Sequence, residues 1–542
     1  MRNPRFLPVA VLAIALSALA GGLFGSRALA RQDEVTQQYR VFTAALDAID
    51  KEYVDEVPSD RVIYSAIDGM LHTLDPHSSF FDPRSYAQMR ERQEGHYYGL
   101  GITIQAIDGD ILVGNVFEGS PAFRRGIRRG DTIAKIAGES AKGWASDKAV
   151  SKLKGPKGTS VQVSIKRRGF DELIDLTVER DEVSIPSIQG AFMIDERTGY
   201  IRLHDFTEVT DRDLGTSLTR LQSRGMQRLI LDLRDNPGGQ MDQSIRVSNR
   251  FLPRGDMIVY TRGRTRHSDE DYHASEPATV PALPMIVLVN RNSASASEIV
   301  SGALQDHDRA LIVGETTFGK ALVQSLYRIA GEAGLALTTA RYYTPSGRMI
   351  QRPWDGTFDE YLTYSYREQD DQPREHKGSE LKLTDGGRQV FGGGGIEPDR
   401  HMTGPIEGFN PGRFGRSLHS RQLFADFAQR FSEQGDTRIV GGKDRRLVAR
   451  NFTVDDAMVA DFKTFLTSEA RVVLDEEGWN KDQAFIRAMI RYEIDSALFS
   501  VEDARRHLVS VDPQAQYALS LFGEAEGLTH LTAASRQAKA DK

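Results

Sequence analysis

Apolar side chains recur at intervals of three and four residues in two stretches near the N-terminus, over 35–56 and 62–74. The apolar positions are Val35, Tyr39, Phe42, Leu46, Ile49 and Tyr53 in the first stretch, and Val62, Ile63, Ile67, Met70, Leu71 and Leu74 in the second. This spacing places them on one face of a helix. We therefore predict two amphipathic helices, whose apolar faces need a later domain or a second copy of the chain to cover them.

Short strand patterns follow over 96–181, and from 199 to about 345 apolar strand patterns alternate with helical ones. Strands rich in Leu, Ile and Val between helical segments are typical of a sheet with helices on its faces. Because 542 residues are too many for one hydrophobic core, several domains are expected. The pattern predicts a multidomain protein of mixed α/β and α+β class.

A helical period returns over 404–542, with apolar positions such as Phe424, Phe427 and Phe431. The apolar-faced helices of this extension fit an oligomerisation or partner-docking domain, and they also fit an inhibitory lid. The predicted boundaries are thus a helical region over 31–95, a strand-rich module over 96–181, a sheet-and-helix core over 182–403 and this helical extension.

The first 30 residues have the pattern of a secretory signal. Arg2 and Arg5 precede an uncharged apolar stretch over 6–26, and Ala-Leu-Ala stands at 28–30. The apolar stretch is also just long enough to span a bilayer, so an uncleaved signal anchor is the alternative. In either case we predict that the rest of the chain is exported to the periplasm or cell envelope.

Composition excludes several classes of function. The formal net charge of −7 argues against a general nucleic-acid binder, which needs a basic surface to neutralise phosphates. The chain has no cysteine, which removes thiolate nucleophiles, disulfides and cysteine zinc sites. Its 12 histidines show no metal-ligand spacing, so we expect neither a metal nor a cofactor.

Three segments carry chemistry that fits together. In LDLRDNPGGQ (231–240), Gly238 and Gly239 let a strand end in a sharp turn whose N–H groups could hold a developing oxyanion. Taken alone, the segment also fits an ordinary strand-to-helix turn.

The second segment, LVNRNSASASEIVSGAL (288–304), places serines at 293, 295 and 297 between an apolar strand and a helix. A serine there lies near helix N–H groups, which favour negative charge. The same pattern fits helix capping, with Glu298 completing a capping box after Ser295. From the residues alone, no one serine can be chosen as a nucleophile.

In the third segment, GETTFGKALVQ (314–324), Lys320 and Gln324 follow a strand and a turn. A lysine can act as a base only when neutral, which requires a buried site. Most lysines are simply solvated, so this segment is informative only in combination with the other two.

In combination, NPGG, SASASE and FGKxxxQ, in this order and followed by GGGGIEPD (392–399), resemble the carboxyl-terminal processing proteases, also called tail-specific proteases. The resemblance covers roughly 35–403. It implies that Ser295 is the nucleophile, that Lys320 is its base and that Gln324 orients the lysine. The oxyanion hole would be formed by the N–H of Ala296 with that of Gly238 or Gly239.

The resemblance also implies that 96–181 is a PDZ-like module and that 182–403 is the protease core. Gly99, Leu100, Gly101 and Ile102 would then form a loop that binds a substrate's terminal carboxylate, with 144–153 as the other wall of the groove. A plain hairpin is the alternative for this loop.

The sequence thus predicts a serine endopeptidase that cleaves envelope proteins at or near their C-termini, without a metal or cofactor. Expected partners are proteins or peptides with free C-termini and a second copy of the chain. An adaptor protein is a further candidate partner, and no nucleic acid is expected. The alternative is an inactive PDZ scaffold or adaptor on a protease fold.

Overall fold

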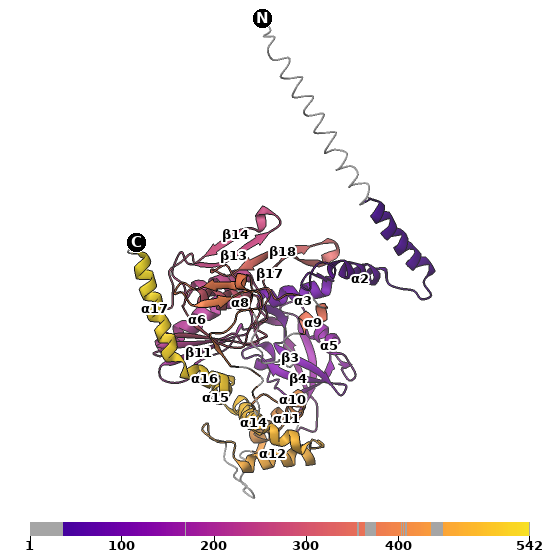
Figure 1. Cartoon of the computed structure of the whole chain (residues 1–542). Coiled ribbons are helices and arrows are strands. Elements are labelled where there is room, and N and C mark those ends of the chain that lie inside the picture. Colours follow the sequence, from indigo (N-terminus) through magenta and orange to yellow (C-terminus); the bar gives the residue numbers. More distant parts are fainter. Residues whose placement is uncertain are drawn as a thin grey trace. The chain divides into compact units, whose positions relative to one another are not determined.

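The computed structural model describes residues 36–167, 170–354, 357–363, 376–402, 404, 406, 409–434 and 448–540. The predicted signal at 1–30 lies outside the described residues. Contacts divide the chain into two compact units (Figure 1). The first combines the N-terminal part up to Asp82 with Leu326–Ala336, and the second contains Pro83–Ser325 and Leu337–Lys542.

The first unit is mainly helical, with a helix over 36–52, α2 (Ser59–Leu71), β1 (Ser79–Phe81) and the short η2 (Ala330–Glu332). Strand β1 pairs antiparallel with residues 334–336 of β18 (Gly334–Tyr343). Tyr64 of α2 contacts the Phe80 ring, with centroids 4.8 Å apart. The two expected amphipathic helices are present, and much of their apolar surface is exposed, including Tyr39, Tyr53 and Met70.

The strand-rich module of the second unit is an antiparallel sheet in the order β3-β4-β5-β7-β8. Its elements are α3 (Pro83–Glu94), β2 (His96–Gly99), β3 (Ile102–Ile107), β4 (Asp110–Val116), α4 (Pro121–Arg124), β5 (Thr132–Ile136), β6 (Glu139–Ser140), α5 (Ser146–Leu153), β7 (Ser160–Lys166), β8 (Ile174–Glu179) and β9 (Asp181–Ser184). Alternating apolar residues such as Ile111, Val113 and Ile133 form one buried core. Strand β3 lies at the edge of this sheet.

The core of the second unit is a six-stranded sheet in the order β10-β11-β12-β15-β16-β21, parallel except for β10. Its strands are β10 (Ile188–Met193), β11 (Thr198–Leu203), β12 (Arg228–Asp232), β15 (Met285–Val289), β16 (Leu311–Gly314) and β21 (Arg400–His401). Around it lie α6 (Thr210–Ser223), α7 (Met241–Asn249), β13 (Met257–Gly263), η1 (Arg266–Ser268), β14 (Glu270–His273), α8 (Ala296–Asp306), β17 (Leu322–Arg328), α9 (Phe358–Leu362), η4 (Gly378–Glu380), β19 (Leu381–Leu383) and β20 (Gln389–Phe391).

Both faces of this sheet are buried, which explains why its strands are apolar almost throughout. Along β15, Met285, Val287 and Val289 face the core that contains α6, α7 and α8. The alternate residues, Ile286 and Leu288, face a second core on the other side. The predicted sheet with flanking helices is confirmed.

The C-terminal extension supplies this second core (Figure 1). Its helices are α10 (Arg413–Ser420), α11 (Leu423–Gln434), α12 (Asp456–Ser468), α13 (Glu476–Lys481), α14 (Gln483–Leu498), α15 (Val501–Val511), α16 (Pro513–Ser520) and α17 (Phe522–Ala540). Ala515 and Ala518 of α16 and Phe522 of α17 pack with Ile286 and Leu288 of the sheet. The last helices of the chain are therefore a structural layer of the core.

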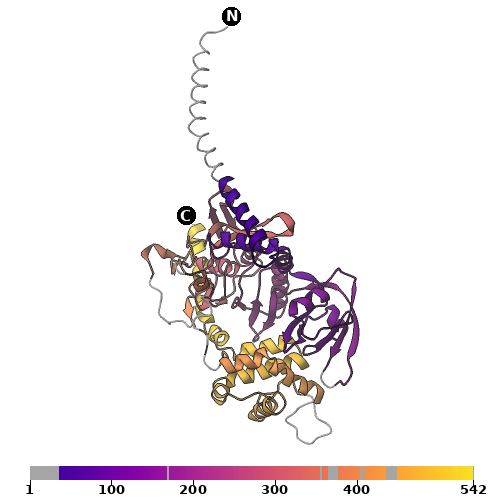
Figure 2. The ribbon, with the colours of Figure 1, turned by 90° about the vertical axis from the view of Figure 1, so that its right-hand side faces the viewer.

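Helices α10–α14 form a separate cluster of their own. In it the Phe462 ring stacks on Phe424 and meets Phe427 edge-on, with centroids 5.0 Å apart in each pair. Figure 2 shows this cluster beside the strands of the PDZ-like module. Arg129 of that module pairs with the buried Glu493 of α14. The apolar faces predicted over this part of the extension are therefore buried largely against one another.

Candidate active site

The three segments singled out in the sequence all follow the carboxyl ends of neighbouring parallel strands. The turn 233–239 follows β12, Ser295 follows β15, and Lys320 follows β16. These strands are adjacent and parallel, in the order β12-β15-β16. In open α/β sheets, ligands bind at this edge. The topology thus brings together three segments that are up to about 80 residues apart in the chain.

The turn after β12 is held by Asn236, whose side chain is fully buried. Its amide Nδ2 donates to the Leu203 carbonyl at 2.9 Å, and its Oδ1 accepts from the Gly238 N–H at 2.9 Å. Gly238 and Gly239 both have positive φ. A Cβ on Gly238 would lie 2.8 Å from Cβ of Ser295, and one on Gly239 would lie 2.2 Å from the Phe206 carbonyl oxygen. Only glycine fits at either position.

The alternating serines have different surroundings. Ser293 and Ser297 are fully buried, and both hydroxyls fasten their segment to the turn after β12. Ser293 Oγ donates to the Leu233 carbonyl at 2.8 Å, and Ser297 Oγ donates to the Asn236 carbonyl at 3.0 Å. Ser295 alone of the three is partly exposed. The structure therefore favours Ser295 as the serine that can meet a substrate.

The backbone of Ser295 is strained, with φ 55° and ψ −112° directly before α8. A non-glycine residue in such a conformation costs about 1–3 kcal/mol and persists only where its surroundings impose it. An ordinary helix cap has extended backbone instead. A serine on a sharp turn between strand and helix is the arrangement that exposes a nucleophilic hydroxyl.

Glu298 connects the serine segment with the lysine segment. Its carboxylate is fully buried and accepts the N–H of Ser295 at 2.8 Å and the N–H of Lys320 at 2.9 Å, both on Oε2. Its other oxygen, Oε1, accepts the Gly319 N–H at 2.7 Å and the Thr317 hydroxyl at 2.5 Å. One side chain thus fixes the backbone at both predicted catalytic positions.

The electrostatics of Glu298 follow from this burial. Removal from water raises its pKa to about 7, although the four donors around it favour the charged form and lower the pKa. At neutral pH the carboxyl group is therefore close to its titration midpoint.

Tyr342 of β18 makes a second connection, on the carbonyl side of the same two residues. Its hydroxyl donates to the Lys320 carbonyl oxygen at 2.6 Å and lies 3.2 Å from the Ser295 carbonyl oxygen. The ring is fully buried, and burial raises the pKa of the hydroxyl well above its usual value. Ser295 and Lys320 are thus bridged by Glu298 at their N–H groups and by Tyr342 at their carbonyls.

The start of α8 and the turn after β12 each contain a backbone N–H that is a candidate donor to an oxyanion. Within the described residues, neither the Ala296 N–H nor the Gly239 N–H donates to another protein group. The Ala296 N–H is the first of α8, where the helix leaves its donors without partners. The Gly238 N–H, in contrast, is bonded to Asn236. Of the two glycines left open by the sequence, Gly239 therefore has the free donor.

Lys320 lies in the turn that leads into β17, and Gln324 lies within that strand. Lys320 is partly buried, and Gln324 Nε2 donates to Thr338 Oγ1 at 3.1 Å. The role of the Lys320 amine as the base for the Ser295 hydroxyl, and the orienting role of Gln324, stay predictions.

The predicted carboxylate loop lies between β2 and β3. Leu100 is buried, and a Cβ on Gly101 would lie 2.2 Å from Cβ of Ser120, so this residue must be glycine. Burial raises the pKa of Tyr97 to about 12, and the N–H groups of Gly101 and Ile102 oppose that rise. These two N–H groups therefore face the hydroxyl oxygen of Tyr97 in this structure.

Strand β3 supplies the open edge that a peptide would need. Among the described residues it pairs with β4 alone, and it is the first strand of its sheet. The Ala106 N–H near its end donates to Ser146 Oγ of α5 at 3.0 Å. The edge of β3 lies beside helix α5, and a peptide that added a strand to this edge would lie near the loop 99–102.

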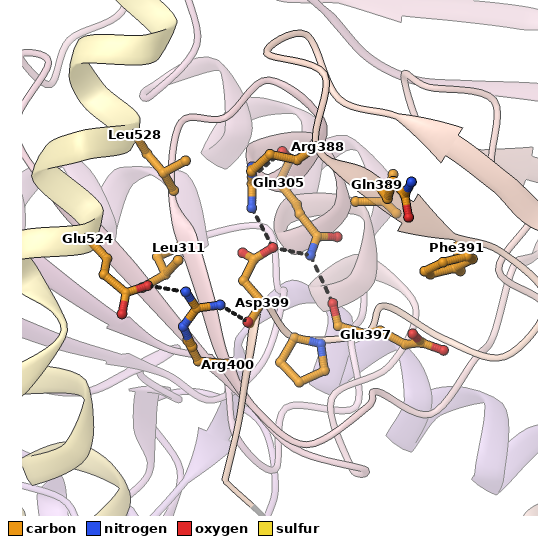
Figure 3. A pocket seen from close by; sticks show the side chains of 12 residues that line it. Gln305, Leu311, Arg388, Gln389, Phe391, Glu397, Asp399, Arg400, Glu524 and Leu528 are labelled. Atoms are coloured by element: carbon orange, nitrogen blue, oxygen red, sulfur yellow. Dashed lines mark hydrogen bonds and ion pairs between the residues drawn. The ribbon is translucent and has the colours of Figure 1, made fainter. Parts of the chain in front are cut away.

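A cavity of about 360 Å³ lies at the far end of α8, near Gln305 (Figure 3). At 1.5 Å per residue this end is about 15 Å from Ser295. The polar side chains around it are paired with one another, as in Arg400 with Glu524 at 2.6 Å and Arg388 with Asp399 at 2.5 Å. These pairs hold α17 and the segment before β21 to the core.

Sequence reasoning missed two residues of this site. Glu298 was noted as a capping residue, and the local spacing that marked it was the only signal of its role. Tyr342 lies inside a strand and had no such signal.

Among the described residues there is no group of three or more acidic or histidine side chains that could hold a metal ion. No helix of the described part is both long and apolar enough to cross a membrane.

Comparison with known proteins identifies related chains. Residues 197–357 match peptidase family S41, and residues 88–166 match the PDZ domain. A carboxy-terminal-processing protease of Bartonella bacilliformis is 39% identical over 319 residues, which are 58% of this chain and 73% of the relative. The carboxy-terminal processing protease CtpA of Bacillus subtilis is 31% identical over 351 residues, 64% of this chain and 74% of the relative. A solved structure, a photosystem II D1 C-terminal processing protease, is 26% identical with a TM-score of 0.35, covering 67% of this chain and 92% of that one.

The raised pKa of Glu298 predicts a pH dependence of stability. Because the folded protein holds this proton up to about pH 7 and the unfolded chain releases it near pH 4.5, unfolding becomes easier as the pH rises through this range. The loss is about 3 kcal/mol and is complete above the folded pKa. Glu298→Gln cannot titrate, so the difference in unfolding free energy between wild type and variant should fall by that amount between pH 4.5 and 8.

Urea unfolding at several pH values measures this difference. A difference between wild type and Glu298→Gln that stays constant with pH would contradict the prediction.

Proposed function

The chain belongs to the carboxy-terminal processing proteases and is a serine-type peptidase with a PDZ domain, and on this premise we propose that Ser295 is its nucleophile and Lys320 its general base. The observation that carries this proposal is the Glu298 carboxylate, which binds the backbone N–H of both residues. Such a clamp keeps two side chains at a fixed separation, which a reaction between them requires.

In the proposed reaction, Ser295 Oγ attacks the scissile carbonyl carbon while the neutral amine of Lys320 takes the hydroxyl proton. The negative charge that develops on the carbonyl oxygen would be bound by the N–H groups of Ala296 and Gly239. The amide bond breaks as Lys320 returns the proton to the leaving amine. Water then attacks the acyl-enzyme ester, again with Lys320 as the base, and frees Ser295. Gln324 would orient the lysine.

We propose that the PDZ domain selects substrates by their free C-terminus. The N–H groups of Gly101 and Ile102 would bind the terminal carboxylate, and the preceding residues would add a strand to the open edge of β3. Binding there could deliver the chain end to Ser295 and could gate the activity. An adaptor protein with a suitable C-terminus would be able to use the same groove.

We predict that Ser295→Ala and Lys320→Arg both abolish turnover and leave the fold intact. The first removes the nucleophilic oxygen, and the second keeps a positive charge that cannot be given up as a proton. Hydrolysis of a fluorogenic peptide should fall at least about 10⁴-fold in each variant, with an unchanged melting temperature.

Ser293→Ala and Ser297→Ala are the controls for this pair. Ser297→Ala removes one buried hydrogen bond. Ser293→Ala removes two, to the Leu233 carbonyl and from the Asn290 N–H. Each bond is worth about 1 kcal/mol of stability, so both variants should keep measurable activity. If Ser297→Ala were inactive and Ser295→Ala active, the assignment of Ser295 as the nucleophile would be wrong. Near-normal turnover by Lys320→Arg would rule out lysine as the base.

A second prediction concerns the PDZ domain. Amidating the C-terminus of a substrate peptide removes the negative charge that the N–H groups of Gly101 and Ile102 would bind. A hydrogen bond to a charged group is worth about 1.5–3 kcal/mol. The affinity of the Ser295→Ala enzyme for the amidated peptide, measured by calorimetry, should therefore be at least tenfold lower than for the free acid. Equal affinities would remove carboxylate capture from the proposal.

We further propose that the protein assembles as a homo-oligomer through its first unit. Tyr39, Tyr53 and Val54 lie in the helical region over 36–74 with exposed fractions of 69%, 58% and 86%, which is costly for apolar side chains in water. Sedimentation of residues 31–542 should show a species larger than a monomer at micromolar concentration. Replacing Tyr39 and Tyr53 with serine should shift it to the monomer, and a wild-type chain that is monomeric throughout would refute the proposal.

The location of the protein in the cell envelope is also a proposal, and it rests on the charge and hydropathy pattern of residues 1–30. Its substrates would then be envelope proteins with loose C-termini. Fractionation of cells, with N-terminal sequencing of the protein recovered, would show whether the segment is removed or retained. Recovery in the cytoplasm with an intact N-terminus would contradict the proposal.

A further inference from the structure

The C-terminal extension contacts the residues at the end of β12, which leads into the turn 233–239. Arg234 stands two residues after β12, and its side chain is only 8% exposed. Its Nη2 lies 2.6 Å from an oxygen of Asp232 and 2.6 Å from Oδ2 of Asp512. Its Nη1 donates to Gln514 Oε1 at 2.8 Å. Two of the three side chains that bind this buried guanidinium therefore come from the extension.

Asp512 is itself held firmly. It is the N-cap of α16, and its Oδ1 accepts the N–H of Gln514 at 2.9 Å and that of Ala515 at 3.3 Å. Its other oxygen, Oδ2, is thereby directed at Arg234. Ala515 and Ala518 of the same helix pack into the sheet face beneath. The carboxylate is thus fixed by the helix that it caps and by the packing of that helix on the core.

The residues after Arg234 form the turn that carries the free donor. Asp235 has a φ of 59°, which is strained for a residue other than glycine, and Gly239 follows four positions later. The side chain of Asp235 is bonded to Asn290 at 2.8 Å and Asn292 at 3.0 Å, which precede Ser295. A strained turn keeps its shape only if both of its ends are fixed. Asn236 fixes it toward Gly238, and Arg234 fixes its start.

We propose that Asp512 is a positioning residue of the protease site, supplied by the C-terminal extension. It acts through Arg234 on the turn 235–239 and sets the place of the Gly239 N–H relative to Ser295. The inference rests on the proposed function, because it assigns that N–H to the oxyanion. It gives the extension a catalytic purpose in addition to its structural one. An enzyme without this contact would bind substrate normally and stabilise the transition state poorly.

The test uses Asp512→Asn in the full chain, because asparagine keeps the helix cap and removes the charge. Loss of a well-placed oxyanion donor costs about 10²–10³ in kcat, so a displaced one should cost at least about tenfold. We expect kcat to fall by that factor while KM changes less than twofold. A peptide aldehyde, whose adduct with Ser295 carries an oxyanion, should bind at least tenfold more weakly, and the matching peptide alcohol should bind as to wild type.

Asp475→Asn is the matched control. It also caps a helix of the extension, α13, by accepting from the Gly478 N–H, and it should leave kcat and aldehyde binding unchanged. If Asp512→Asn does not fold, Gln514→Leu removes the neighbouring bond to Arg234 and is held to the same criteria. Unchanged kcat in the folded variant, or equal weakening of aldehyde and alcohol, would overturn the inference. Activity retained by Ser295→Ala would instead refute the proposed function itself.

Discussion

One buried carboxylate organises the candidate site. Glu298 has no contact with solvent, so its two oxygens must be satisfied by the protein, and they are satisfied by the backbone of the two segments that carry Ser295 and Lys320. Leaving such a group without partners would cost several kcal/mol. The turn before α8 and the turn after β16 therefore cannot separate without exposing Glu298 or leaving it unpaired. The strained backbone of Ser295 is stable for the same reason.

The alternation of apolar runs was enough to predict the sheet and its helices, because strands buried on both faces are apolar throughout. It could not show what covers the second face. That layer comes from α16 and α17, more than 200 residues after Leu288, and no local pattern links the two. The purpose of the extension was accordingly left open by the sequence. An apolar strand with two buried faces was nevertheless a signal that a second layer must exist.

The site could be predicted in outline and not in detail. The order of the motifs and the rule that parallel strands end at one edge bring 238, 295 and 320 together. From the residues alone the three serines could not be told apart, and it was the family resemblance that implied Ser295. The backbone angles and exposure that distinguish Ser295 appear only in the folded chain. Glu298 was recognisable only as a helix cap, since its bond to Ser295 spans three residues whereas its bond to Lys320 spans 22. Long-range partners of this kind become visible only in the folded chain.

The clamp can be tested directly by amide hydrogen exchange of the wild type and of Glu298→Ala. In the wild type the N–H groups of Ser295, Gly319 and Lys320 are bonded to one carboxylate, so all three should exchange slowly. In Glu298→Ala they should lose protection together, while the Ala294 N–H, which is bonded to the Asn236 carbonyl, stays protected. Loss of protection at Ser295 alone, with Gly319 and Lys320 unchanged, would show that Glu298 does not join the two segments.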